Sequence, residues 1–134
     1  MSPATQAPFD SLKGENFIRL TTFRKNGTPV PTPVWFARDG DRLIVTTSSK
    51  AGKVKRLRHT PHVQLIASGP SGNPRQNATH IEAQAHFLPE SQFTYAENAL
   101  SRKYTWQYAL IRLLHRLRGG AKATYFEIRP WAEV

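Results

Sequence analysis

The most constraining feature of this sequence is a hairpin whose second strand carries a proline at every other position. The first strand, Phe17–Arg24, is rich in β-branched and aromatic residues, and the pair Asn26-Gly27 after it tolerates the positive φ of a tight turn. The prolines of the second strand are Pro29, Pro31 and Pro33. Because proline has no backbone N–H, it cannot donate to a ladder on that side. The sequence therefore predicts an antiparallel hairpin whose second strand is a sheet edge or a bulged rim beside a ligand.

Four later segments have the length and the alternation of strands. They are Arg42–Thr47, His62–Ser68, Thr79–Leu88 and Ala123–Arg129. Turn residues separate them, and the hairpin-like spacing is not that of strand–helix–strand crossovers. The sequence therefore predicts a mainly β fold of the α+β class, a six-stranded antiparallel barrel with two to three helices.

Two regions have helical patterns. In Lys50–His59, Val54 and Leu57 form an apolar side, and Ser48-Ser49 before it offers good N-cap side chains. From Ser91 to Arg118 apolar and aromatic residues recur every three or four positions, up to a Gly-Gly stop. We expect one short helix in the first region and, in the second, two helices broken near residues 101–105.

The chain has the length of one ordinary domain, 134 residues with 39% hydrophobic content. We expect residues 1–134 to form one domain, with residues 1–8 as a flexible N-terminal arm. The absence of cysteine excludes disulfides, thiolate metal sites and a cysteine nucleophile. The sequence has neither a signal-peptide pattern nor the roughly 20 apolar residues needed to cross a bilayer. We therefore expect a cytoplasmic protein with no membrane partner.

Charge predicts the kind of ligand. Nineteen Lys and Arg residues against nine Asp and Glu residues give a net charge of +10, which favours a partner with negative charge. Five of the basic residues fall within Lys50–Arg58 and four within Arg112–Lys122. The excess charge is therefore concentrated in two places.

The segment Thr46–Leu57 has the features of an anion site. It runs from the end of a strand through four hydroxyl side chains into the start of a helix, where backbone N–H groups and the helix dipole favour an anion. At 100° per residue, Lys53 and Arg56 lie on one flank of the helix, and Lys55 and Arg58 lie on the other. The alternative is a solvated helix whose basic residues only aid solubility.

With these features the sequence resembles the split β-barrels of the pyridoxamine 5'-phosphate oxidase-like family, in the branch that uses the deazaflavin coenzyme F-420. The resemblance covers Phe17 to Trp131 and rests on three segments in order: Thr21–Phe36, Thr46–Val63 and Ile81–Leu88. It implies an oxidoreductase that transfers a hydride between the cofactor and a small organic substrate. It also implies a homodimer with the cofactor site between the subunits.

The resemblance also assigns the cofactor site by position. The ring is expected beside Thr32, Pro33, Val34 and Trp35, and the phosphate beside Thr46, Thr47, Ser48, Lys50, Lys53 and Arg56. The basic residues Arg112, Arg116, Arg118 and Lys122 could attract the oligoglutamate tail of coenzyme F-420. No side chain is singled out as catalytic, and the substrate is not identified.

Two alternatives remain from the sequence. The same fold could bind flavin mononucleotide (FMN), or a basic barrel could bind nucleic acid. Nucleic acid is disfavoured because the aromatic residues fall mostly at alternating core positions. Five histidines occur without an accompanying carboxylate cluster, so we expect no metal site.

Overall fold

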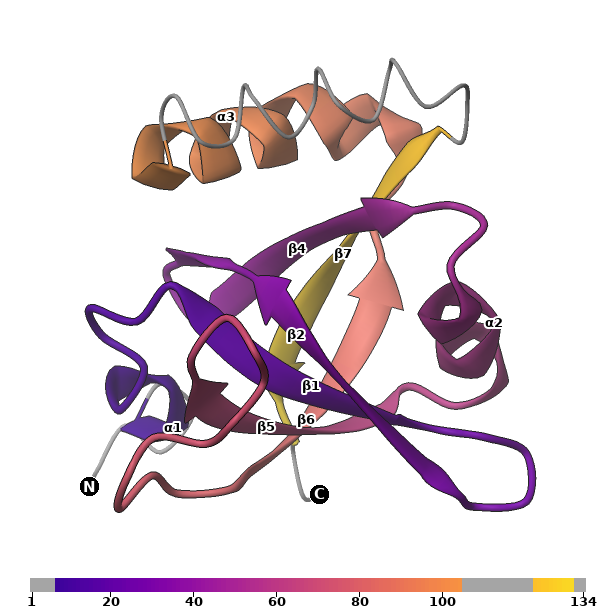
Figure 1. Cartoon of the computed structure of the whole chain (residues 1–134). Coiled ribbons are helices and arrows are strands. Elements are labelled where there is room, and N and C mark those ends of the chain that lie inside the picture. The colour runs from indigo at the N-terminus through magenta and orange to yellow at the C-terminus, as the bar shows by residue number, and fades with distance from the viewer. Residues whose placement is uncertain (1–6, 105–121, 132–134) are drawn as a thin grey trace.

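The computed structural model describes residues 7–104 and 122–131 (Figure 1). Within these residues seven strands form one antiparallel sheet in the order β2-β1-β5-β6-β7-β4-β3. The strands are β1 (Phe17–Phe23), β2 (Pro29–Trp35), β3 (Ala37–Asp39), β4 (Arg42–Ser48), β5 (His62–Ser68), β6 (Ile81–Phe87) and β7 (Ala123–Pro130). The predicted mainly β, antiparallel fold is confirmed, but the structure has seven strands where we predicted six.

Helices cover the sheet at separate places. They are α1 (Ala7–Asp10), α2 (Gly52–His59) and α3 (Phe93–Tyr104), with a 3-10 turn η1 (Glu90–Gln92) before α3. Figure 1 shows α3 lying across one side of the sheet, close to the ends of β4 and β7, while α2 lies at a different end of the curled sheet. Helix α1 begins inside the stretch 1–8 that we expected to be an arm. Of the predicted helical region 91–118, residues 105–118 lie outside the described part.

The seventh strand is a continuation of the second. β2 ends at Trp35 and β3 begins at Ala37, so only Phe36 separates them. β2 pairs with β1, whereas β3 pairs with β4, so the chain changes its neighbour at Phe36. One bent strand therefore joins the two ends of the sheet, and this is why the sequence pattern showed it as one element.

Side chains from the end of α3 hold this bend. The backbone N–H of Phe36 donates to the Tyr104 hydroxyl at 3.0 Å, and that hydroxyl also lies within hydrogen-bond distance of the carbonyls of Phe36 and Asn16. The Lys103 ammonium donates to the carbonyls of Phe36 and Glu15 at 2.9 and 2.7 Å. Backbone groups that leave one ladder before joining the next are thus satisfied by side chains.

Within the described residues β2 and β4 are not paired with each other, although they lie close together. β3 pairs only with Arg42–Ile44, so on that side β4 is unpaired over residues 45–48. β2 pairs only with β1, and its prolines must point their ring nitrogens away from β1, because the ladder with β1 is continuous over residues 29–35. The edge position predicted from the prolines is confirmed. We call the boundary between these two free edges the seam.

Two apolar clusters pack on the two faces of the sheet. The inward faces of β1, β2, β4, β5, β6 and β7 surround one cluster, which includes Leu20, Val45, Leu65 and Phe126. The second cluster lies between α3 and the sheet and includes Ile44, Leu100, Tyr104 and Tyr125. The curled sheet thus has an enclosed interior and an outer face that α3 covers in part. In residues 7–104 and 122–131 no helix is long and apolar enough to span a membrane.

Candidate functional site

Helix α2 presents two different flanks. Val54 and Leu57 are buried, as predicted, and the helix packs against β1. On one flank Lys53 and Arg56 are half-buried, whereas on the other flank Lys55 and Arg58 are exposed. Exposed basic residues need no further explanation, but half-buried cations normally have a partner. Lys53 and Arg56 are therefore expected to have a partner, either in the protein or in a ligand.

Arg56 reaches from α2 to β1. Its Nε donates to the hydroxyl of Thr22 at 2.6 Å, and Thr22 is itself buried. Burial lowers the pKa of Arg56, and the positive charge of Arg24, just beyond the end of β1, lowers it further. The guanidinium is therefore held by a neutral hydroxyl and repelled by a second arginine.

Lys53 lies beside Arg56 without a compensating acid. Burial lowers the pKa of Lys53, and the charge of Arg56 adds to this effect. Within the described residues, none of Arg24, Lys53 and Arg56 forms an ion pair with a carboxylate. We call these three residues the α2 cation cluster. The sequence pattern indicated Lys53 and Arg56 but not Arg24, which precedes the Asn-Gly turn and lies near α2 only in three dimensions.

The start of α2 differs from the prediction. The helix begins at Gly52, not at Lys50, and its N-cap residue is Ala51, which makes no side-chain cap hydrogen bond. Ser49 lies three residues before Gly52, and its N–H donates to the carbonyl of Lys122 at 2.8 Å, so it extends the contact between β4 and β7 instead of standing at the helix start. The first amides of α2 therefore have no capping side chain, and such amides favour an anion.

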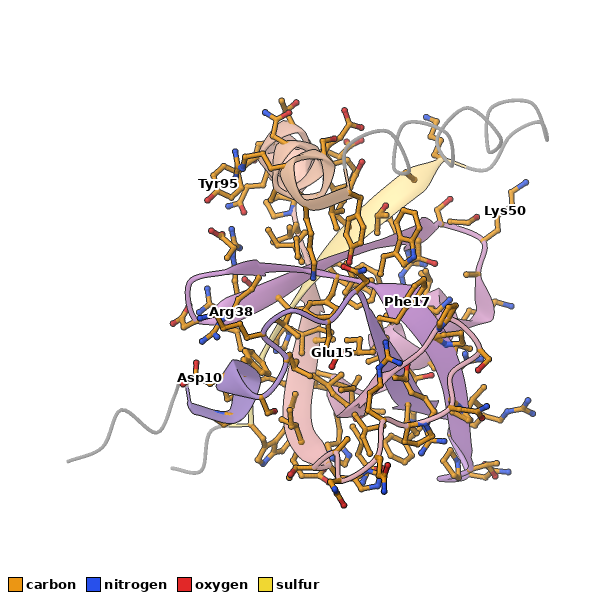
Figure 2. All side chains as sticks on the ribbon, turned by 60° about the vertical axis from the view of Figure 1, so that its left-hand side comes forward. Asp10, Glu15, Phe17, Arg38, Lys50 and Tyr95 are labelled. Atoms are coloured by element: carbon orange, nitrogen blue, oxygen red, sulfur yellow. The ribbon has the colours of Figure 1, made fainter. Side chains whose placement is uncertain are left out.

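The predicted hydroxyl residues at the end of β4 are spread over two faces. Thr47 follows Val45 on the inward face, whereas Thr46 and Ser48 follow Ile44 on the outer face. Thr46 Oγ1 already donates to the carbonyl of Thr124, and Ser48 Oγ accepts from the Lys50 N–H at 3.2 Å. Lys50 itself is exposed and points away from the body of the molecule (Figure 2). The structure thus brings Lys53 and Arg56 together, but it does not bring Lys50 to them.

The predicted ring residues on β2 also divide between the faces. Thr32 and Val34 face inward beside Leu20 and Ile18, while Pro33 and Trp35 face outward. Trp35 stacks on Tyr104 of α3 with the ring centroids 4.5 Å apart. A ligand could contact both sets only around the free edge of β2, at the seam.

Thr32 has a buried hydroxyl with no partner. Its Oγ1 is inaccessible to solvent and makes no hydrogen bond within the part of the chain that the structure describes. An unpaired buried hydroxyl costs free energy unless a ligand or water completes it. Of the four predicted ring residues, Thr32 is therefore the one whose polar group still needs a partner.

A second charged region on β3, β4 and β7 is fully paired. Arg42 contacts Asp39 at 3.0 Å and Glu127 at 2.9 Å, and Arg129 contacts Glu127 and Asp41, both at 3.1 Å. Burial alone would raise the pKa of Glu127, but hydrogen bonds from the two arginines outweigh it and lower this pKa. We call these five residues the ion network.

A cavity of about 260 Å³ lies near the bend, lined by Leu12, Lys13, Gly14, Phe36, Arg38 and Lys103. Two of its cations have partners there: Arg38 pairs with Asp10 at 2.8 Å, as Figure 2 also shows, and Lys103 donates to two carbonyls. Burial lowers the pKa of Lys103 to about 8. We do not assign the candidate site to this cavity because Arg38 and Lys103, two of its three cations, are already engaged.

Metal ligands do not gather in the described part of the chain, where no three His, Cys, Asp or Glu side chains lie close enough to hold an ion. Of the four basic residues expected to attract an anionic tail, Arg112, Arg116 and Arg118 lie outside the described residues. Lys122 is exposed.

Comparison with known proteins shows a matching family model and solved structures with a similar fold. A family model described as pyridoxamine 5'-phosphate oxidase matches residues 4–131. An F420 reductase is 21% identical over 92% of this chain and 93% of its own, with a TM-score of 0.59. An FAD-binding protein from Mesorhizobium loti is 17% identical over 98% and 91%, with a TM-score of 0.66. HutZ, the heme storage protein from Vibrio cholerae, is 13% identical over 92% and 87%, with a TM-score of 0.69. No curated protein matches the sequence. At these identities the solved structures establish the fold alone.

Proposed function

The chain belongs to the pyridoxamine 5'-phosphate oxidase family, and we propose that it is an oxidoreductase that binds coenzyme F-420 in the seam. The observation that carries this proposal is the α2 cation cluster. Of its three cations only Arg56 has a hydroxyl partner, and within the described residues none forms an ion pair with an acid, so they suit a phosphate group. The uncapped amides at the start of α2 add donors at the same end of the barrel.

The residues of the chain fit a phosphate-bearing ring cofactor in two ways. Lys53 and Arg56 would hold the phosphate through charge-assisted hydrogen bonds. Thr32 would offer its buried hydroxyl to the edge of a ring that lies in the seam, and Val34 would exclude water from the inward side. A bound deazaflavin would supply the hydride chemistry. The proton donor and the substrate are not assigned.

Net charge supports coenzyme F-420 over FMN. The family resemblance associates the deazaflavin with a phosphodiester and an oligoglutamate tail, and the chain carries a net charge of +10. A surplus of this size attracts a polyanion more strongly than a single phosphate. FMN is the second candidate, because the α2 cation cluster would serve its phosphate equally well.

Exposed aromatic residues argue against a nucleic-acid interface. Binding of single strands uses aromatic rings displayed on an exposed strand face. The large exposed hydrophobic side chains in the described residues are Tyr95, on α3, and Trp131, after β7. These two residues do not form a stacking surface on a strand, so the nucleic-acid function is the weakest of the three.

A homodimer is part of this proposal. Arg19 lies on the outward face of β1, and its Nε is buried without a hydrogen-bond partner in the described residues. On the same face, Phe17 and Phe23 are only half-buried. A second copy of the chain could supply an acceptor for Arg19 and cover this face. Light scattering at micromolar concentration should give twice the mass of the chain, and a monomer mass would reject the dimer.

A titration tests the proposed cofactor. Purified protein is titrated with coenzyme F-420, FMN and riboflavin, and binding is followed by fluorescence. We expect the tightest binding for coenzyme F-420, weaker binding for FMN and the weakest for riboflavin, which lacks the phosphate. Binding of neither phosphate-bearing cofactor would reject the proposal. A steep loss of affinity for DNA or RNA with salt, without cofactor binding, would favour the nucleic-acid function instead.

A further inference from the structure

The guanidinium of Arg56 lies across the first residue of its own helix. A Cβ atom at Gly52 would lie 2.9 Å from Arg56 Nη1, with Cζ and Nη2 at 3.8 and 3.9 Å. Real Cβ atoms do not approach other heavy atoms this closely, so the guanidinium uses space that any residue other than glycine would fill. Its Nε is already committed to Thr22, which fixes the side of the helix on which the two Nη groups lie.

The backbone does not explain a glycine at this position. Gly14, Gly27, Gly40 and Gly72 have a positive φ, which favours glycine, but Gly52 does not. In a helix glycine is also less stable than alanine, because it loses more conformational freedom on folding. The feature of Gly52 that the structure does use is the empty space beside its Cα.

We propose that Gly52 is a positioning residue for Arg56: by leaving this space open, it lets the Nη groups of Arg56 lie beside the uncapped amides of α2 and face the same phosphate. This inference rests on the proposed phosphate-bearing cofactor. It assigns a role in binding to a residue that has no side chain and contacts the ligand at most through its backbone.

The substitution Gly52→Ala separates this role from a structural one. Alanine favours the helix, so the melting temperature should stay the same or rise. The new methyl group should push the guanidinium aside, and affinity for a phosphate-bearing cofactor should fall about 10-fold, the usual effect of losing one hydrogen bond to a charged group. A structural glycine would lose stability and affinity together.

The control variants are Gly69→Ala and Arg56→Ala. Gly69 also lacks a positive φ, and a Cβ atom there would come no closer than 3.9 Å to a neighbour, Nη1 of Arg75. Gly69→Ala should therefore bind as the wild type does. In the Arg56→Ala background, Gly52→Ala should cause no further loss, because the group that it displaces is gone.

The experiment is a double-mutant cycle of Gly52→Ala and Arg56→Ala, titrated with coenzyme F-420, FMN and riboflavin. We expect the 10-fold loss for the two phosphate-bearing cofactors and no change for riboflavin. Wild-type affinity in Gly52→Ala would overturn the inference, provided that Arg56→Ala binds weakly. An equal loss from Gly52→Ala in both backgrounds would also overturn it.

A second measurement needs no ligand, so it keeps the inference separate from the proposed function. The Nε–H proton of Arg56 should give a protected NMR signal in the wild type and in Gly69→Ala, because it is bonded to Thr22. In Gly52→Ala this signal should shift or lose its protection. If the wild type binds neither cofactor, the proposed function fails and this signal alone decides the positioning role; an unchanged signal in Gly52→Ala overturns it.

Discussion

The α2 cation cluster and the ion network both contain two arginines, and the cluster also contains Lys53, but the two regions differ in the partners of their cations. In the ion network each arginine contacts two carboxylates, and Glu127 joins Arg42 to Arg129. In the α2 cation cluster, the described residues give the Arg56 guanidinium one hydrogen-bond partner, the hydroxyl of Thr22, and its charged neighbours there are Lys53 and Arg24. Both regions lie at the ends of strands, so a position at a strand end does not by itself decide whether a cation is paired with a carboxylate.

The two regions differ in whether their charges contribute to folding or to ligand binding. Arg42 and Glu127 of the ion network are mostly buried, and removing one member of such a pair leaves its partner without a compensating charge, which costs stability. Clustered and half-buried cations cost free energy in the free protein, through desolvation and mutual repulsion, and a bound anion recovers that cost. Charge should therefore matter to folding in the ion network and to binding in the α2 cation cluster.

The largest expected effect is on cofactor binding in Lys53→Ala. Loss of a charge-assisted contact typically costs about 1.5–3 kcal/mol, or roughly 10- to 150-fold in affinity. The domain should stay folded, because removal of a half-buried and unpaired cation relieves repulsion. The measurement is a fluorescence titration beside a thermal melt.

Lys55→Ala is the matched control, since it removes the same charge from the exposed flank of the same helix. It should change affinity much less than Lys53→Ala does. Equal losses in the two variants would mean that the helix acts only as a diffuse basic field. No loss in either would remove the phosphate from α2.

The next effect is on stability in Glu127→Gln. This change leaves two arginines without their shared carboxylate and should cost about 1–3 kcal/mol in the free energy of unfolding. Urea denaturation measures it, and Asp41→Asn, at a more exposed position, should cost less. Cofactor affinity should not change. A large loss of affinity in Glu127→Gln would break the distinction between the two regions.

A smaller effect is expected for Arg24→Ala. Arg24 is exposed and contributes to the cluster only through its field on Arg56, so its loss should weaken cofactor binding by roughly 0.2–1 kcal/mol, or about 1.5- to 5-fold. High salt should reduce this effect more than the effect of Lys53→Ala, because salt screens exposed charges best. A loss as large as that of Lys53→Ala would mean that Arg24 contacts the phosphate directly.

The smallest effect is the pH dependence of binding. Because burial lowers the pKa of Lys53 below its ordinary value of 10.5, the free protein loses this charge earlier than an exposed lysine would as the pH rises. Affinity for the phosphate should therefore be constant near neutral pH and should decline as the pH approaches 10.5. Lys53→Arg should flatten this decline. The same decline in the arginine variant would assign the titration to another group.

Local signals predicted most of the fold. The turn at Asn26-Gly27 has the expected positive φ at Gly27, and the Asp-Gly turn before β4 has one at Gly40. The three prolines predicted the edge position of β2, and alternation predicted the buried positions of β6. Each of these features depends on residues that are neighbours in sequence, so periodicity and turn chemistry were sufficient.

Features that depend on distant residues could not be predicted in this way. β3 is separate from β2 because it pairs with β4 and not with β1, and at the change of neighbour the backbone of Phe36 bonds to Tyr104, 68 residues away. Ser49 looked like an N-cap, but the carbonyl of Lys122 takes its N–H. Arg24 joins the candidate site only because β1 ends beside α2. Periodicity and turn residues describe neighbours in the sequence, so they do not predict contacts between residues that are far apart in it.

The prolines of β2 have a consequence for how molecules of this chain meet one another. An ordinary free strand edge templates the addition of another strand, which is the route to aggregates and domain swapping. On β2 that edge offers carbonyls at residues 29, 31 and 33 but no N–H at the same positions, so an incoming strand would complete only part of a ladder. This edge can therefore stay unpaired without becoming the growing end of a polymer.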